Sequence, residues 1–237
     1  MTARNLLLLS SSRYRDYGSL EFGEEIIRDF LGDRRRILFL PYAIVMDDRA
    51  GFIKTMQRRF DELGHELISI EDMDDPVAAL NEFDVIAVNG GNTFQLLHCL
   101  YKHELVEAIR QRVQDGMLYL GWSAGSNITC PTICTTNDMP IVQPHSFTAL
   151  NLLPFQVNAH YTDVVPVGFR GETRRMRIEE YLLLNSGQTV VGLPEGNMLH
   201  VHDDAISAHG EQPLVIFKAN ESPRELAPGE DLSFLLD

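Results

Sequence analysis

The stretch Leu118-Tyr119-Leu120-Gly121-Trp122-Ser123-Ala124-Gly125 joins a short apolar run to a serine flanked by small residues. Residues 118–121 predict a buried strand, and the G-x-S-x-G pattern at its end is typical of a sharp turn from a strand into a helix. Small neighbours avoid clashes around a strained serine in such a turn. We therefore expect the Ser123 hydroxyl above the end of a sheet, with the backbone N–H of Ala124 beside it. An ordinary glycine-rich turn with an incidental serine is the simpler alternative.

Similar apolar runs recur along the first half of the chain, and segments with helical spacing separate them. Continuous apolar strands that alternate with helices predict a parallel sheet covered on both faces. The expected fold class is therefore α/β: a three-layer α/β/α sandwich with a mostly parallel sheet, whose ligands bind beyond the carboxyl ends of the strands. The predicted strands lie at residues 6–9, 37–40, 66–70, 85–88 and 118–121, and the main predicted helices at 20–31, 52–63 and 105–113.

The last third of the chain has a different pattern, with shorter apolar runs and a hairpin-like Asp203-Asp204 pair. This pattern predicts a short antiparallel addition at the edge of the sheet. Because no linker, repeat or low-complexity tract interrupts the sequence, we expect residues 1–237 to form a single domain. The short runs lie at residues 190–193, 198–201, 205–207 and 214–217.

The chain is acidic, with a net charge of −14 and a sequence pI near 4.9. Such a surface repels phosphate backbones and anionic lipids, so we expect neither a nucleic acid nor a membrane as partner. No apolar run approaches the ~18 residues that span a bilayer, and the four leucines at 6–9 are too few for a signal peptide, which needs ~7–15 apolar residues. We therefore expect a cytoplasmic protein. The sequence does not give the oligomeric state, and a homodimer stays open.

Neither the cysteines nor the histidines predict a metal site. Cys99, Cys130 and Cys134 are an odd number, which argues against a disulfide framework, and no second Cys/His pair at zinc spacing accompanies them. His200 and His202 would share one face of a strand, but two ligands without a third make a weak case. We expect free thiols, no metal and no organic cofactor.

A second loop of small residues, Asn89-Gly90-Gly91-Asn92-Thr93, follows the predicted strand at 85–88. In a parallel sheet, this loop and the Ser123 turn emerge on the same side. The N–H of Gly91 can then join that of Ala124 in an oxyanion hole. A tight strand-to-helix turn capped by Thr93 is an equally good interpretation. A phosphate-binding loop is less favoured, because no lysine follows in the P-loop position.

A serine nucleophile needs a base, and the base needs an acid that holds its tautomer. Of the eight histidines, His145 and His160 are the candidate bases, and His160 is the better one because it follows an apolar stretch past a predicted strand end. Two carboxylates compete for the acid. Asp138 gives the order Ser-Asp-His, and Glu195 gives Ser-His-Glu. Order along the chain does not decide between them, since such triads occur in several orders.

Taken together, these segments resemble the peptidase E family of aspartyl dipeptidases. The individual serine motif is not specific, but the ordered set from about residue 85 to 200 is. The matching stretches are Asn89-Gly90-Gly91-Asn92-Thr93-Phe94-Gln95-Leu96-Leu97, Gly121-Trp122-Ser123-Ala124-Gly125, Thr135-Thr136-Asn137-Asp138-Met139-Pro140-Ile141-Val142, Asn158-Ala159-His160, Gly171-Glu172-Thr173-Arg174 and Gly192-Leu193-Pro194-Glu195-Gly196-Asn197.

The resemblance implies a fold like that of the class I glutamine amidotransferases, with Ser123 as nucleophile and His160 as base. The family pattern contains both Asp138 and Glu195. We favour Glu195 as the partner of His160 because it follows a strand end, and Asp138 stays a candidate for the charge-relay role. One departure is visible: Asn89 stands where the family commonly has the first of three glycines. If that position needs positive φ, asparagine is the best-tolerated replacement, so we expect little harm.

The resemblance also implies specificity for dipeptides with an N-terminal aspartate. A side-chain carboxylate is best bound by a guanidinium. Arg174 lies in the matching stretch and inside a basic cluster of an otherwise acidic chain, so we expect it to bind this carboxylate, with Asn92 near the site. The alternative is that the arginines of this cluster (Arg170, Arg174, Arg175 and Arg177) only pair with Glu179, Glu180 and their neighbours along a solvated helix.

Two other functions remain open on sequence grounds. One is a related serine hydrolase with a more open site, such as one acting on the aspartyl storage polymer cyanophycin. The other is a non-catalytic binding protein that kept the fold. Intact Ser123, His160 and two candidate acids argue against such decay, and an amidotransferase would carry cysteine at position 123.

Overall fold

The main sheet has seven strands in the order β3-β2-β4-β5-β1-β8-β9. In the computed structural model, which describes residues 4–34 and 36–236, the strands from β3 to β1 pair in parallel, and β8 and β9 pair antiparallel. The domain predicted for 1–237 includes residues 1–3, 35 and 237, which lie outside the described residues. The strands are β3 (Glu66–Ser69), β2 (Arg36–Leu40), β4 (Val85–Val88), β5 (Leu118–Trp122), β1 (Asn5–Leu9), β8 (Met198–His202) and β9 (Ala205–His209).

Helices cover both faces of this sheet, because its parallel strands are apolar on both faces. Leu7 and Phe39 pack with α1 and α2 on one face, whereas Leu8 and Val88 pack with α4 and α5 on the other. The predicted three-layer α/β/α class is thereby confirmed. The helices are α1 (Glu24–Leu31), α2 (Arg49–Leu63), α3 (Pro76–Ala79), α4 (Thr93–Lys102), α5 (Leu105–Gln114) and α6 (Ala124–Asn127), with short 3-10 turns η1 (Ile70–Asp72) and η2 (Ser233–Leu236).

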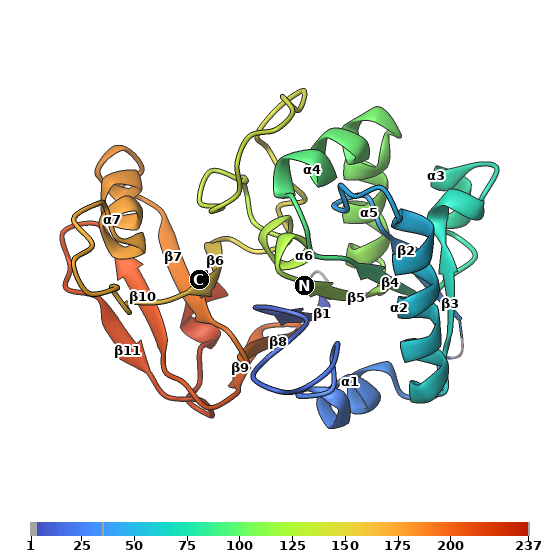
Figure 1. Cartoon of the computed structure of the whole chain (residues 1–237), viewed down its shortest axis with the longest axis horizontal. Helices are drawn as coiled ribbons and strands as arrows, with labels where there is room; N and C mark the ends of the chain where they lie inside the picture. The colour runs from blue at the N-terminus through green and yellow to red at the C-terminus, as the bar shows by residue number, and fades with distance from the viewer. Residues whose placement is uncertain (1–3, 35, 237) are drawn as a thin grey trace.

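A second sheet of four strands, in the order β11-β10-β7-β6, stands at one end of the molecule (Figure 1). β6 and β7 are parallel, and β10 is antiparallel to both of its neighbours. The helix α7 (Arg174–Leu184) packs on this sheet through Ile178 and Leu182, against Val190 and Phe217. The strands are β6 (Gln156–Tyr161), β7 (Thr189–Pro194), β10 (Leu214–Lys218) and β11 (Arg224–Leu226).

The antiparallel addition predicted at the C-terminus is therefore divided between two sheets. β8 and β9 form the expected hairpin beside β1, with Asp203 in its turn at φ 54°. β7 and β10 instead belong to the second sheet, which the sequence did not predict. Several boundaries also differ by a few residues: Leu20, for example, precedes α1 at φ 63°, and Ile70 lies in η1, after β3 has ended.

One apolar core connects the two sheets. It runs from Leu8 and Val88 in the large sheet to Val157, Leu193 and Ile216 in the small one. The carboxyl ends of β5, β6 and β7 therefore meet at the junction, which is where ligands bind in such sheets. Across the two ranges that the structure describes, no helix has both the length and the apolar character needed to cross a membrane.

Candidate active site

Ser123 occupies a strained turn between β5 and α6. Its φ and ψ are 54° and −112°, a conformation that L-residues adopt only when the surroundings enforce it. The flanking glycines are required by close backbone approach: a Cβ on Gly121 would lie 2.5 Å from the Gly125 carbonyl oxygen, and one on Gly125 would lie 2.1 Å from that of Val88. The G-x-S-x-G spacing thus follows from space inside the fold.

Buried hydrogen bonds hold this turn in place. The Tyr119 hydroxyl donates to the Gly125 carbonyl at 2.7 Å, and burial raises the pKa of Tyr119 well above its ordinary value. Ser126 Oγ donates to the Leu9 carbonyl at 2.6 Å, and the same carbonyl accepts from the Ser123 N–H at 3.0 Å. The turn is therefore fixed both to its own strand and to β1.

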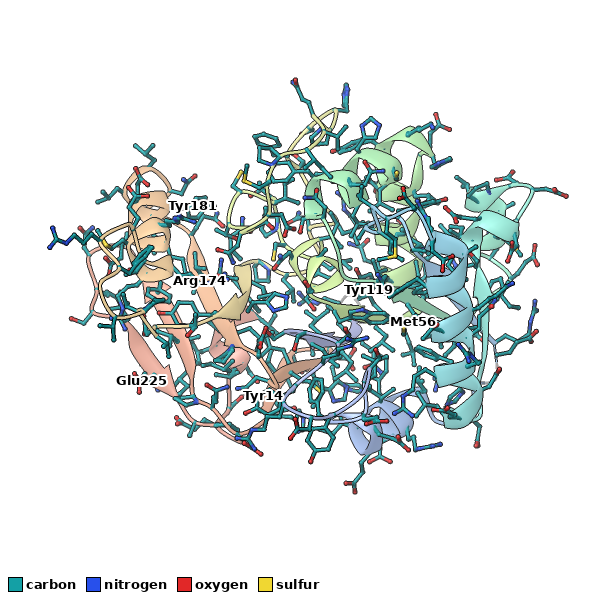
Figure 2. All side chains as sticks on the ribbon, viewed as in Figure 1. Tyr14, Met56, Tyr119, Arg174, Tyr181 and Glu225 are labelled. Atoms are coloured by element: carbon teal, nitrogen blue, oxygen red, sulfur yellow. The ribbon has the colours of Figure 1, made fainter. Side chains whose placement is uncertain are left out.

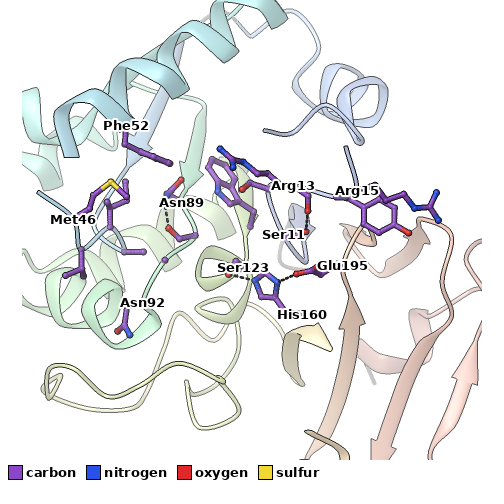
Figure 3. A pocket seen from close by; sticks show the side chains of 18 residues that line it. Ser11, Arg13, Arg15, Met46, Phe52, Asn89, Asn92, Ser123, His160 and Glu195 are labelled. Carbon is purple, nitrogen blue, oxygen red and sulfur yellow. Dashed lines mark hydrogen bonds and ion pairs between the residues drawn. The ribbon is translucent and has the colours of Figure 1, made fainter. Parts of the chain in front are cut away.

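His160 reaches Ser123 from the small sheet. It lies in β6 at φ 57°, where the pairing with β7 shifts register between Ala159 and Tyr161. His160 Nε2 lies 2.8 Å from Ser123 Oγ, and His160 Nδ1 lies 2.8 Å from Glu195 Oε1 (Figure 3). Glu195 follows β7 directly. A serine, a histidine and a carboxylate from three strand ends thus form one hydrogen-bonded line.

Ser10 is a site residue that sequence reasoning missed. It is fully buried at the end of β1, accepts a hydrogen bond from the His160 N–H at 2.8 Å and donates to the Leu193 carbonyl at 2.8 Å. One hydroxyl therefore fixes the backbones that carry His160 and Glu195. Only its place directly after an apolar strand, on the side of the Ser123 turn, could have drawn attention to it.

Asp138, the other candidate acid, lies elsewhere. Its Oδ2 accepts from the Thr93 N–H at 2.7 Å, from Thr93 Oγ1 at 2.6 Å and from Thr136 Oγ1 at 3.1 Å. A carboxylate here satisfies a free N–H in the first turn of α4 and complements the helix dipole. The geometry therefore joins Glu195, and not Asp138, to His160. The other candidate base, His145, packs against Tyr101 with ring centroids 5.5 Å apart.

The predicted oxyanion loop packs against the serine turn. A Cβ on Gly90 would lie 3.0 Å from that of Ser123. Gly91 has φ 142°, and a side chain there would meet the Ala43 carbonyl. Within the described ranges, the N–H groups of Gly91 and Ala124 have no backbone acceptor, which leaves both available to a ligand.

Asn92 serves as the cap of α4, a role that the sequence interpretation gave to Thr93. Its Oδ1 accepts from the Gln95 N–H at 3.0 Å, and its Nδ2 donates to the Met139 carbonyl at 2.8 Å. Asn92 also lines the cavity in front of Ser123, so one of its amide hydrogens is left for a ligand.

A cavity of about 610 Å³ opens in front of the Ser123–His160–Glu195 line. Its lining combines these side chains with the loop at 89–92, the segment after β1 and an apolar wall between β2 and α2 (Figure 3). Volumes in this range are typical of small-molecule sites.

Arg174 does not line this cavity. It opens α7, on the side of the helix that faces the rest of the molecule (Figure 2), and borders a smaller cavity of about 140 Å³ under the segment at 162–173. Its half-buried guanidinium leaves Nη1 without a hydrogen-bond partner among the described residues. Burial, followed by the nearby Arg177, lowers the pKa of Arg174, whereas the charges of Glu195 and Asp138 oppose this shift. The neighbouring Arg175 differs, since it pairs with Asp163 at 2.6 Å.

His200 and His202 both lie on β8, with ring centroids 6.3 Å apart. His200 Nε2 donates to Asn5 Oδ1 at 3.1 Å, and its ring meets that of Phe30 edge-on. In the part of the chain that is described, no group of three His, Cys, Asp or Glu side chains is arranged to hold a metal ion.

Comparison with known proteins identifies the family. A model of Peptidase family S51 matches residues 6–209. The chain belongs to peptidase family S51. As a member of this family, it is a serine dipeptidase.

The relatives of this S51 member cover nearly its whole length. A protein named Peptidase E from Nostoc sp. is 41% identical over 236 residues, which is 99% of this chain and 98% of the relative. Another Peptidase E, from Shewanella denitrificans, is 42% identical over 234 residues, 99% of this chain and 100% of the relative. A solved peptidase structure from an acI-B1 Actinobacterium has a TM-score of 0.73 at 20% identity, covers 98% of this chain and 97% of its own, and has the same fold.

Proposed function

We propose that this S51 peptidase hydrolyses dipeptides with an N-terminal aspartate, with Ser123, His160 and Glu195 as its catalytic triad. The unpartnered Nη1 of Arg174 carries the specificity part of this proposal. A half-buried guanidinium that lacks an acceptor is suited to a carboxylate ligand. Aspartate at the first position supplies that carboxylate.

The first half of the reaction uses the hydrogen-bonded line. Ser123 Oγ attacks the carbonyl carbon of the aspartyl residue while its proton passes to His160 Nε2. Glu195 holds His160 in the tautomer with a proton on Nδ1 and stabilises the imidazolium. The N–H groups of Gly91 and Ala124 donate to the oxyanion, where each such donor is typically worth about 10²–10³ in rate.

The second half releases both products. The imidazolium of His160 gives its proton to the nitrogen of the leaving residue, the C–N bond breaks and an aspartyl ester remains on Ser123. Water then attacks this ester with His160 as base, and the return of the proton to Ser123 Oγ frees aspartate. Asn92 offers its remaining amide hydrogen to the bound peptide.

We also propose the cytoplasm as the compartment. Cys99 and Cys130 are buried free thiols, and Cys134 is an exposed free one, a set that suits a reducing environment. Burial raises the pKa of the Cys130 thiol to about 12, so it stays protonated.

Hydrolysis of Asp-Leu beside Asn-Leu, Glu-Leu and N-acetyl-Asp-Leu tests the function. We expect cleavage of Asp-Leu, at least a ~10³-fold lower kcat in Ser123→Ala, and a fall of about 10²-fold in kcat/KM in Arg174→Ala. Arg177→Ala is the matched control, because this exposed arginine lies on the same helix and contacts Glu172. Equal rates on Asp-Leu and Asn-Leu would refute the role of Arg174, and a Ser123→Ala enzyme of normal rate would refute the mechanism.

A further inference from the structure

The cavity in front of Ser123 has an apolar wall that the catalytic groups do not use. Ile44, Val45 and Met46 follow β2, and Phe52 faces them from α2. Figure 3 shows Met46 and Phe52 together on the side of the cavity opposite Glu195. The wall therefore lies on the far side of Ser123 from the small sheet.

Two side chains of this wall are unusually exposed. Val45 is 62% and Met46 is 54% exposed, although both are large and apolar and both border a cavity. Apolar side chains that remain open to water beside a reactive serine are typical of a surface that a ligand covers. The ligand part that covers them must itself be apolar.

A cation borders the same cavity. Arg13 and Arg15 both lie on its rim, in the segment between β1 and α1. Arg15 points away and pairs with Glu211 at 2.6 Å, whereas Arg13 points across the mouth of the cavity toward the side of Phe52 (Figure 3). Among the described residues, no hydrogen bond or ion pair engages the Arg13 side chain. Of the two arginines that line the cavity, Arg13 is therefore the one whose guanidinium can pair with an anionic group of a ligand.

The backbone around Arg13 is held in place. Ser11 Oγ donates to the Arg13 carbonyl at 2.6 Å, the Leu20 N–H donates to the Ser12 carbonyl at 2.6 Å, and the Tyr17 N–H donates to the Tyr14 carbonyl at 3.1 Å. Since Ser11 directly follows Ser10, this segment starts at the hydroxyl that fixes His160. The position of Arg13 is thus tied to the catalytic line.

We propose that this side of the cavity binds the second residue of the dipeptide: Arg13 binds its free C-terminal carboxylate, and the wall of Val45, Met46 and Phe52 receives its side chain. This inference rests on the proposed function. It assigns the two carboxylates of Asp-Xaa to different guanidiniums, with Arg174 on the side of the small sheet and Arg13 on the side of the large one. A longer peptide has an uncharged amide where Arg13 needs a carboxylate, so Arg13 favours dipeptides.

The test compares Asp-Leu, with its free carboxylate, with Asp-Leu-amide and with Asp-p-nitroanilide, which has neither the carboxylate nor the leucine. In the wild type we expect kcat/KM to be about tenfold higher for Asp-Leu than for its amide, since a charge-assisted hydrogen bond is lost. Arg13→Ala should remove this preference and lower kcat/KM far less for the p-nitroanilide than for Asp-Leu. Arg15→Ala is the matched control and should keep the preference.

A second comparison addresses the wall. Phe52→Ala should lower kcat/KM for Asp-Leu about fivefold or more and leave Asp-Gly nearly unchanged, because only leucine has a side chain to bury there. Equal losses on both peptides would overturn the assignment of the wall.

The outcomes separate the two proposals. If aspartyl substrates are cleaved but the wild type shows no preference for the free carboxylate, the proposed function stands and Arg13 has no such role. If Arg13→Ala loses discrimination between Asp-Leu and Asn-Leu instead, Arg13 binds the aspartate side chain and the inference is wrong. If no aspartyl substrate is cleaved, including the p-nitroanilide, the proposed function fails and the inference fails with it.

Discussion

At the scale of single residues, the site depends on one buried hydroxyl as much as on the reacting groups. Ser10 receives the His160 N–H and donates to the carbonyl of Leu193, two residues before Glu195. Among the described residues, no hydrogen bond joins its hydroxyl to Ser123, and Ser10 does not line the cavity in front of that serine. Its effect on the reaction must therefore pass through the placement of the imidazole and the carboxylate.

Replacement of Ser10 by alanine tests this positioning role. We expect kcat to fall about tenfold with little change in KM, since the imidazole loses its alignment while the cavity is kept. Ser69→Ala is the matched control, because Ser69 is also buried but lies at the end of the edge strand β3, where it caps η1. A loss of stability without a change in kcat, as expected for Ser69→Ala, would show that Ser10 is merely structural.

The two acids offer a second test at this scale. Glu195→Gln should lower kcat by about 10²–10⁴-fold, because glutamine does not stabilise the imidazolium or fix its tautomer. Asp138→Asn should keep most of the activity and lose about 1 kcal/mol of stability, since it weakens the bonds to Thr93. Measured kcat values and urea unfolding curves compare the two. The reverse ranking of kcat would return the charge-relay role to Asp138.

The sequence could not decide between these acids, and the reason is physical. Both Asp138 and Glu195 occupy loops, and the order of residues along the chain does not give the distance between their side chains in the fold. The choice depends on β7 lying beside β6, a pairing between segments about thirty residues apart. Ser123 was predictable because a short stretch of sequence carries its constraint: the turn needs Gly121 and Gly125 on either side.

At the scale of elements, the parallel strands were predictable and the second sheet was not. Residues 85–88 and 118–122 are buried on both faces, which a continuous apolar run reports directly. β7 and β10 have equally apolar sequences. Nothing in such a run says which sheet it joins, so the sequence prediction placed all the C-terminal strands at one edge.

The edge hairpin of β8 and β9 makes stability depend on pH. Burial, followed by the charges of His209 and His202, lowers the pKa of His200, and burial lowers that of His209. Above pH ~6.5 these groups are neutral in both states; as pH falls below it, the unfolded chain binds protons that the folded one resists. Stability should therefore decline from pH 7.5 to 5.5.

His200→Gln should flatten that decline. Melting temperatures of the wild type and the variant at several pH values in this window give the measurement. Equal slopes would mean that His200 takes up its proton as readily in the folded chain as in the unfolded one.

At the scale of the whole molecule, the catalytic line crosses the junction between two sheets. Ser123 comes from the large sheet, and His160 and Glu195 come from the small one. The apolar core is continuous through this junction. Catalysis needs these three side chains to be placed to within a few tenths of an ångström. The two sheets must therefore behave as one rigid body.

A single unfolding transition is the corresponding prediction. Trp122, the one tryptophan of the chain, reports on the large sheet, whereas activity needs both sheets. In a urea titration, tryptophan fluorescence and residual activity should change at the same midpoint, because the shared core makes unfolding cooperative. Loss of activity well before the change in fluorescence would mean that the small sheet detaches first, against the prediction of a single domain.

The backbone of Ser123 and His160 has a consequence for engineering. Both hold positive φ angles, 54° and 57°, which glycine would adopt at less cost. Improvement of this enzyme by heat challenge alone would therefore enrich for variants that relax these two positions, and those variants are inactive. A library meant to yield a more heat-tolerant catalyst should keep both codons fixed and score every survivor for turnover.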